Sequence, residues 1–297
     1  MAERRKRRFN LQAVIGTVPM IIVSVGVYIV GIGFTFYWSF TNSKVFPSNT
    51  LVGLDQYRRL WASDRWLAAI DNIWYFGAMS IISNMVFGYL LAVFMDQRIR
   101  QEDLFRSIFL FPFAMSLIVT GLVWQWALDP NFGIQETMHS LGWTSFHFSP
   151  LVDIDTAIYG LVVAGIWQGS GVTMAILLSG LRGIDEEIWK AARVDGIPTW
   201  RTYLFIALPM MRGALATAFV LQCVGVIRVY DLIIAMTGGG PGISTTMPAV
   251  YVIDMITSSQ NVGQGMAAAT MMLLPVLVIL AVFFLWQRRN QGEGATP

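Results

Sequence analysis

Long apolar stretches are the feature that most restricts how this chain can fold. A helix that crosses the hydrocarbon core of a bilayer needs roughly 20 consecutive apolar residues. Because lipid offers no hydrogen-bonding partner, a crossing segment has to satisfy its own backbone polar groups, as an α-helix does. The sequence therefore predicts an all-α, polytopic integral membrane protein with six transmembrane helices. The six predicted spans are Leu11–Phe40, Asn72–Met95, Ser107–Leu128, Ala157–Leu181, Ile206–Met236 and Gly263–Trp286.

The composition agrees with this class. Of the 297 residues, 55% are hydrophobic and 13% are charged, whereas charged residues make up about 25% of a typical soluble domain. Cys223 is the only cysteine, so the sequence offers neither an internal disulfide nor a cysteine-rich metal site. A further apolar run, Met247–Ile256, is too short to span and is expected to form a re-entrant or interfacial helix outside. One membrane domain is the simplest organisation.

The distribution of lysine and arginine predicts the orientation, since basic residues collect in cytoplasmic loops. With a cytoplasmic N-terminus, fifteen basic residues fall in inside segments and four, Lys44, Arg58, Arg59 and Arg65, in outside segments. We therefore expect a multi-pass protein of the cytoplasmic (inner) membrane with both termini in the cytoplasm. Its parts are a basic N-terminus at 1–10, a transmembrane domain at 11–287 with a cytoplasmic loop at 182–205, and a tail at 288–297.

The loop between the fourth and fifth spans is unusually polar. Asp185 is a good helix N-cap, and Gly196 stands where a left-handed helix stop would fall. Lys190 follows Glu186 by four residues, a spacing that favours an ion pair on a helix. A short helix is therefore predicted, either resting on the bilayer surface or offering a flat face to a partner. That face, at helical spacing, consists of Ile188, Ala191, Ala192 and Asp195.

This loop resembles the EAA loop of binding-protein-dependent ABC importer permeases. The resemblance rests on the spacing Ala-Ala-x3-Gly-x9-Ile-x-Leu-Pro, which runs from Ala191 to Pro209. It implies a coupling helix that sits in a groove of a cytoplasmic ATPase. Lys190 departs from the family pattern, which has a glutamate there, and this leaves the partner contacts at that position open. The implied coupling residues are Glu187, Lys190, Ala191, Ala192, Asp195 and Gly196.

A glycine-rich segment, Thr237-Gly-Gly-Gly-Pro241, follows Tyr230-Asp231. It resembles the hallmark of the carbohydrate branch of these permeases, and we expect Gly238–Gly242 to be a mobile turn at the outer end of the fifth span. A phosphate-binding loop of the Walker A type needs a lysine directly after glycine, and none of the three lysines follows a glycine. The sequence also lacks the serine-hydrolase elbow and the His-Glu-x-x-His motif, so we do not expect an enzyme.

The resemblance implies a type I ABC importer permease fold and a set of partners. These are a second permease subunit in a heterodimer, two ATPase subunits that hold ATP and Mg, and a periplasmic or extracellular solute-binding protein. The substrate would be a carbohydrate, most similar to α-glucosides and related small glycosides or oligosaccharides. The chain would lie in membrane lipid, would itself hold no cofactor or metal, and would bind no nucleic acid.

Polar residues within the fifth predicted span suggest a substrate path, because ionisable groups in a span usually face an interior or a water-filled cavity. Arg228 and Asp231 are three residues apart and are predicted to share a helical face, either as an internal ion pair or as a polar lining for a sugar. Carboxylate and guanidinium groups could instead serve a secondary transporter or channel that needs no ATPase. The candidate path residues are Gln222, Gly225, Arg228, Tyr230, Asp231, Trp167 and Gln168, with Trp124-Gln125 also considered.

The outside segments carry three lesser predictions. Leu54–Ile70 is expected to form an amphipathic helix whose Tyr57, Leu60, Trp61 and Trp66 suit an interfacial belt. His139 and His147 lie in a loop without further convergent ligands and are expected to be solvated rather than metal-bound. Asp129 and Asp254 are each expected to stand alone near the outer surface.

Overall fold

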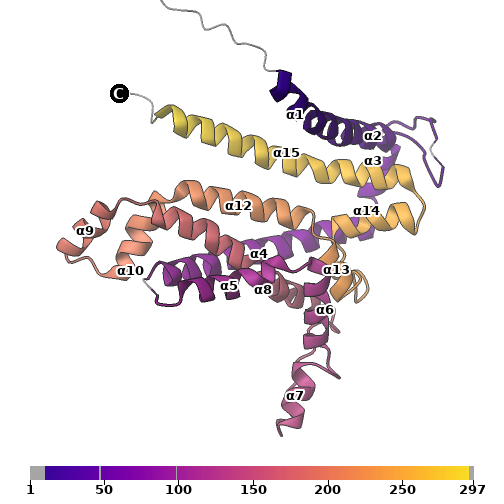
Figure 1. The fold of residues 1–297 in the computed structure, drawn as a ribbon. Helices are drawn as coiled ribbons and strands as arrows, with labels where there is room; N and C mark the ends of the chain where they lie inside the picture. Colours follow the sequence, from indigo (N-terminus) through magenta and orange to yellow (C-terminus); the bar gives the residue numbers. More distant parts are fainter. Residues whose placement is uncertain (1–10, 47, 98, 294–297) are drawn as a thin grey trace, which may run out of the picture.

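The computed structural model describes residues 11–46, 48–97 and 99–293. The predicted basic N-terminus at 1–10, Arg98 and the last four residues of the tail lie outside the described residues. The described chain is built of helices that run mostly side by side (Figure 1). The long ones are α1 (Leu11–Val23) with the π-helical η1 (Ser24–Ile29) and α2 (Val30–Ser39), then α4 (Asp64–Asp96), α8 (Ala157–Arg182) and α15 (Val262–Glu293).

Four continuous helical segments are long and apolar enough to cross a membrane. Two bent helix pairs bring the count to six, in agreement with the six predicted spans. The continuous segments are Gly16–Ser39, Asp64–Asp96, Ala157–Arg182 and Val262–Arg288, and the bent pairs are Glu102–Ala114 with Leu117–Leu128 and Thr199–Met210 with Arg212–Ile227.

The third span is bent, so the prediction of one continuous helix over Ser107–Leu128 is wrong. Helix α5 (Glu102–Ala114) and helix α6 (Leu117–Leu128) meet at 96°. Pro112 removes a backbone donor in the last turn of α5. Ser116 then caps α6, because its Oγ accepts a hydrogen bond from the Val119 backbone nitrogen at 3.3 Å.

The fifth span is broken twice, so a single helix over Ile206–Met236 is also wrong. The first half comprises α10 (Thr199–Arg201), the π-helical η2 (Thr202–Ala207) and α11 (Leu208–Met210). It bends by 74° into α12 (Arg212–Ile227), just after Pro209, which has no backbone N–H to donate. The second break leaves residues 228–230 outside any helix before α13 (Asp231–Met236).

The predicted amphipathic helix over Leu54–Ile70 is wrong in its extent, and its interfacial role is wrong for two of the four residues named for it. It divides into α3 (Asp55–Trp61) and the start of α4, which begins at Asp64. Leu60 and Trp66 are 0% and 1% exposed, so they belong to a packed core rather than to an interfacial belt. They pack with Tyr251, Ala267 and Ala268 from the C-terminal part of the chain.

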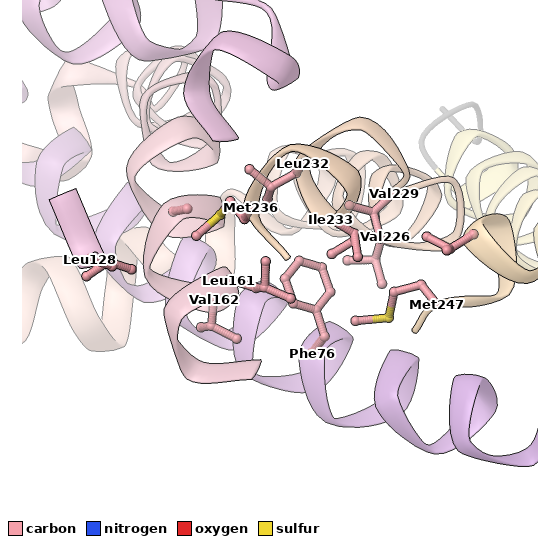
Figure 2. Packing of buried hydrophobic residues seen from close by; sticks show 12 residues of the cluster. Phe76, Leu128, Leu161, Val162, Val226, Val229, Leu232, Ile233, Met236 and Met247 are labelled. Atoms are coloured by element: carbon pink, nitrogen blue, oxygen red, sulfur yellow. The ribbon is translucent and has the colours of Figure 1, made fainter. Parts of the chain in front are cut away.

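The largest apolar core joins α4, α8 and the region around the second break of the fifth span. Figure 2 shows Phe76 of α4 lying among Leu161, Val226 and Met247. Helices α4 and α8 approach closely through small residues: a Cβ on Gly88 would stand 2.6 Å from Thr173 Cγ2. Small residues let transmembrane helices pack in this way without a hydrophobic driving force.

Two other helices are short, α7 (Ile134–Ser140) and α14 (Pro248–Thr257). Helix α14 has ten residues, too few to span, as predicted for Met247–Ile256. Asp254 on α14 is not alone, because it forms an ion pair with Arg65 at the start of α4. The pKa of Asp254 lies below its ordinary value, because a hydrogen bond from Ser258, followed by the contact with Arg65, favours the charged carboxylate.

The Arg65–Asp254 pair predicts a pH-dependent difference in stability. A carboxyl with a lowered pKa stabilises the fold above its ordinary value of about 4, and this contribution disappears as the pH falls through the lowered pKa. Both side chains are partly exposed, so the contribution is about 1 kcal/mol. Asp254→Asn is expected to lower the melting temperature at pH 7, and this difference should shrink as the pH falls below about 4. Asp71→Asn, at an exposed carboxyl, is the control; a difference that does not shrink in acid would contradict the ion-pair account.

The glycine-rich segment Gly238–Gly242 is a hydrogen-bonded turn rather than the mobile one predicted. Thr245 Oγ1 donates to the Gly240 carbonyl at 2.7 Å, and Thr246 Oγ1 to the Gly239 carbonyl at 3.1 Å. Asn72 of α4 donates to the Ile243 carbonyl at 3.0 Å, which anchors the turn to the helix bundle. Positive φ angles of 62°, 93° and 61° at residues 238, 239 and 242 account for the glycines.

Candidate functional site

The polar loop after α8 forms the predicted short helix, α9 (Glu186–Val194). The Asp185 side chain accepts a hydrogen bond from the Glu187 backbone nitrogen at 3.0 Å, and so caps the N-terminus as predicted. At the other end Gly196 has a φ of +70°, and the Ile197 nitrogen donates to the Ala192 carbonyl at 3.0 Å. This is the left-handed glycine stop expected from the sequence. The predicted Glu186–Lys190 ion pair is present at 3.5 Å.

Helix α9 has one side packed on the bundle and one side exposed. Ala192 is only 4% exposed, because it lies on the packed side, and Trp189 and Ile188 are half-buried. The predicted flat face is therefore wrong: it combined Ala192 and Ile188 with Ala191 and Asp195, which are exposed. The exposed side consists of Glu187, Lys190, Ala191 and Val194, continued by Asp195 and Gly196 at its end.

The packed side of α9 meets the bundle at Tyr203, in η2. The rings of Trp189 and Tyr203 have centroids 5.0 Å apart. The Tyr203 hydroxyl donates to Asp96 Oδ2 at 2.7 Å and accepts from Gln97 Nε2 at 2.9 Å. Beside this contact lies a cavity of about 700 Å³ between α9 and the end of α4. It is lined by Asp96, Gln97, Glu186, Trp189, Arg193, Ile197, Thr199, Thr202 and Tyr203.

Ion pairs and a hydrogen bond connect the nearby ends of α4, α5 and α8. Arg182, the last residue of α8, pairs with Glu102 at the start of α5 at 2.8 Å and donates to the Met95 carbonyl of α4 at 3.2 Å. Arg106 pairs with the same glutamate at 2.7 Å. Figure 1 shows α9 and α10 at this end of the bundle and α13 and α14 towards the other. Sequence reasoning missed these residues; only the i, i+4 spacing of Glu102 and Arg106 could have indicated a pair.

The residues predicted to line a substrate path do not share one helical face. Helix α12 ends at Ile227 and α13 begins at Asp231, so Arg228 lies within the non-helical segment and Asp231 directly follows it; both residues are exposed. Neither has an ion-pair partner among the described residues, so the predicted internal pair is absent. Residues 228–230 are not helical, and the charged side chains of Arg228 and Asp231 are exposed.

The other path candidates fall into two groups. Gln222 and Tyr230 contact other parts of the helix bundle. Gln222 Nε2 donates to Thr173 Oγ1 at 2.7 Å, and Tyr230 packs on the core around Phe76. Gly225 instead faces open space, since a Cβ built there would meet no atom within 4 Å. Trp167 and Gln168 are half-buried in α8. The Trp167 ring lies 6.0 Å from that of Trp124 in an edge-on arrangement.

The two histidines of the segment between α6 and α8 lie together, with ring centroids 6.2 Å apart. His139 Nε2 is 2.7 Å from the Phe146 carbonyl oxygen, within hydrogen-bond distance. Over the described ranges no group of three or more His, Cys, Asp or Glu side chains converges as a metal site would require. A chain without its own metal stays a prediction.

Comparison with known proteins finds a matching family model and relatives that are named as transporter permeases. Residues 84–291, which include α9 and all path candidates, match the family model of the binding-protein-dependent transport system inner membrane component. A probable ABC transporter permease of Pyrococcus horikoshii is 32% identical, over 92% of this chain and 94% of its own length. The xylose/arabinose import permease protein XacH of Haloferax volcanii is 30% identical, over 93% and 87%.

A solved structure shows the same fold. A chain of a bacterial alginate ABC transporter, in complex with an alginate pentasaccharide-bound periplasmic protein, superposes with a TM-score of 0.78 at 19% identity, with 96% of both chains covered. The match extends over the broken spans as well as the continuous ones. Together with the family match and the two relatives, it places this all-helical chain among the inner membrane permease components of binding-protein-dependent ABC transporters, the family to which it belongs.

Proposed function

We propose that this chain is the permease subunit of an ATP-driven importer that moves a carbohydrate, a small glycoside or oligosaccharide, across the cytoplasmic membrane. Membership of the family supports the permease role. The name of the xylose/arabinose relative supports a carbohydrate substrate, as does the Thr237–Pro241 segment. The chain has no phosphate-binding loop, so ATP and Mg belong to partner subunits and this subunit hydrolyses nothing.

The observation that carries the proposal is the exposed side of α9. A capped helix that is fixed to the bundle on one side presents Lys190, Ala191 and Val194 on the other. Val194 is 87% exposed, which is unfavourable for an apolar side chain at a polar surface. A groove in an ATPase subunit would cover it. The full assembly would contain two such ATPases, a second permease subunit and an external solute-binding protein.

The orientation follows from the same assignment. Helix α9 and the last turns of α15 lie at the same end of the bundle in Figure 1. If an ATPase docks on α9, that end is cytoplasmic, and the C-terminus is cytoplasmic with it. The excess of basic residues in the same loops and in the N-terminal segment supports this orientation.

The mechanism we propose is alternating access. Closure of the two ATPases moves α9, and the ion pairs around Arg182 carry the movement to the ends of α4, α5 and α8. At the other end, α6 and α13 move together, since a Cβ on Gly121 would stand 2.5 Å from Ala235 Cβ. The non-helical segment beside Arg228 resembles the interrupted helices that line transporter binding sites. Substrate would pass along this segment.

The proposal is tested by expressing the chain with its candidate partners and reconstituting the assembly in vesicles. We expect an ATPase subunit to co-purify and uptake of a labelled sugar to require ATP and the binding protein. Uptake that persists in vesicles without any ATPase would instead support the secondary transporter, for which exposed Asp231 is the candidate coupling group. Stimulation of ATP hydrolysis across a panel of sugars, with the binding protein present, would identify the substrate.

A further inference from the structure

We propose that Tyr203 transmits movement of α9 to α4. Its hydroxyl is needed to couple ATP hydrolysis to transport, but it is not needed to bind the ATPase. The inference rests on the proposed function of α9 and adds a positioning residue to it. Tyr203 lies on the bundle side of α9, away from the exposed face, and is 7% exposed. Its side chain is therefore out of reach of a docked partner.

Tyr203 contacts both moving parts. Towards α9, its ring packs on Trp189 at 5.0 Å with an interplanar angle of 56°. Towards α4, its hydroxyl bonds to Asp96 and Gln97, and its backbone carbonyl accepts a hydrogen bond from the Tyr89 hydroxyl at 2.8 Å. Two hydrogen bonds to α4, a third to Gln97 directly after it, and an aromatic contact to α9 make this residue a bridge between the two helices.

The backbone at Tyr203 is shaped for this role. In the π-helical η2 the Leu208 nitrogen donates to the Tyr203 carbonyl, so that carbonyl accepts from both Leu208 and Tyr89. A π-helical turn is wider than an α-helical one and is frequent at functional sites. The second hydrogen bond on the carbonyl fixes the turn against α4. The backbone turn is thereby held on α4, whereas the side chain that contacts Trp189 is held there through its hydroxyl.

The hydroxyl extends the link to two further helices. Its bond to Asp96, at 2.7 Å, joins a hydroxyl to a side-chain carboxylate, and hydrogen bonds to carboxylates are about twice as strong as those between neutral groups. Asp96 also lies 4.0 Å from the Arg182 guanidinium, which pairs with Glu102. The hydroxyl thus connects α9 to the ends of α4, α8 and α5 through adjacent charges.

The cavity beside Tyr203 makes this link important. A cavity of about 700 Å³ lies between α9 and the end of α4, so side-chain packing between these two elements is interrupted there. Without the hydroxyl, α9 would still rest on the Tyr203 ring, but a push on α9 could be absorbed by movement into the cavity. ATP would then be hydrolysed with less movement of the spans.

The test compares Tyr203→Phe with Tyr75→Phe, a control at a tyrosine of α4 that is 67% exposed. Each variant is assembled with its partners in vesicles, and three quantities are measured: the amount of bound ATPase, the rate of ATP hydrolysis, and the sugar taken up per ATP. For Tyr203→Phe we expect unchanged ATPase binding and about tenfold less uptake per ATP, the change expected from loss of a hydrogen bond to a charged group. Tyr75→Phe should match the native chain in all three.

Asp96→Ala tests the same bond from α4 and serves also if Tyr203→Phe assembles poorly. If the hydroxyl acts through Asp96, the double variant loses no more uptake per ATP than the larger single loss. Native uptake per ATP in Tyr203→Phe, or losses that multiply in the double variant, would overturn the inference while leaving the docking of α9 intact. If no ATPase binds even to the native chain, the proposed function fails and this inference fails with it.

Discussion

Gly196→Val is expected to reduce ATP-driven uptake by at least about tenfold. Gly196 ends α9 with a φ of +70°, a conformation that costs an ordinary L-residue about 1–2 kcal/mol and a β-branched residue more. This conformational free-energy cost would destabilise the turn at Gly196, which sets the angle between α9 and α10. The docking-competent arrangement of α9 would therefore be populated about tenfold less, and apparent affinity for the ATPase would fall with it. Uptake by reconstituted vesicles and ATPase co-purification measure the two effects.

The matched control is Gly196→Asn. A Cβ at this position would meet no atom within 4 Å, so steric clash cannot explain a defect. Asparagine adopts left-handed φ several-fold more readily than valine, so it should retain most of the uptake. Equal losses for both substitutions would show that the backbone conformation is not the cause and would point to direct contact between the ATPase and this position.

Local sequence signals predicted the parts of the molecule that depend on nearby residues. The apolar lengths gave the number of spans because crossing lipid is a requirement on each segment separately. The ends of α9 were predictable for the same reason: Asp185 and Gly196 act on backbone groups within a few residues of themselves. The Glu186–Lys190 pair is local as well.

The breaks in the third and fifth spans were overlooked although part of their signal is local. Pro112 and Ser116 mark the end of α5 and the start of α6, and Pro209 precedes the bend into α12. Hydropathy does not detect such breaks, because the residues on both sides are equally apolar. The prediction that Arg228 and Asp231 share a face failed for this reason, since helical spacing has no meaning across a break.

Contacts between distant parts of the chain were beyond the reach of sequence patterns. Tryptophan is a residue type common at membrane interfaces, but the Trp66 ring packs against that of Tyr251, with 5.3 Å between the ring centroids. Tyr203 and Asp96 are 107 residues apart, and neither belongs to a motif. The same limit applies to the sides of α9: periodicity groups Ala191 with Ala192, whereas the packing of Trp189 on Tyr203 decides which of them is buried.

Val194→Asp is expected to weaken binding of the ATPase by at least about tenfold. Val194 is the most exposed large apolar side chain in the described part of the chain, and it lies on the exposed side of α9. If an ATPase groove covers it, the substitution places a carboxylate without a partner in a desolvated contact, at a cost of about 2 kcal/mol or more. A factor of ten in affinity corresponds to about 1.4 kcal/mol. Binding of purified ATPase to the chain in detergent or nanodiscs gives the dissociation constant directly.

Val194→Leu is the control, because it keeps an apolar side chain at the same position and should bind the ATPase nearly as well as the native chain. The fold should be unaffected in both variants, since Val194 has little contact with the rest of the chain at 87% exposure. Equal melting temperatures would verify this. Native affinity in Val194→Asp would place the ATPase on another part of the chain. Loss of affinity in Val194→Asp but not in Val194→Leu, together with weakened binding by Lys190→Glu, would assign an acidic groove to the surface that faces Lys190.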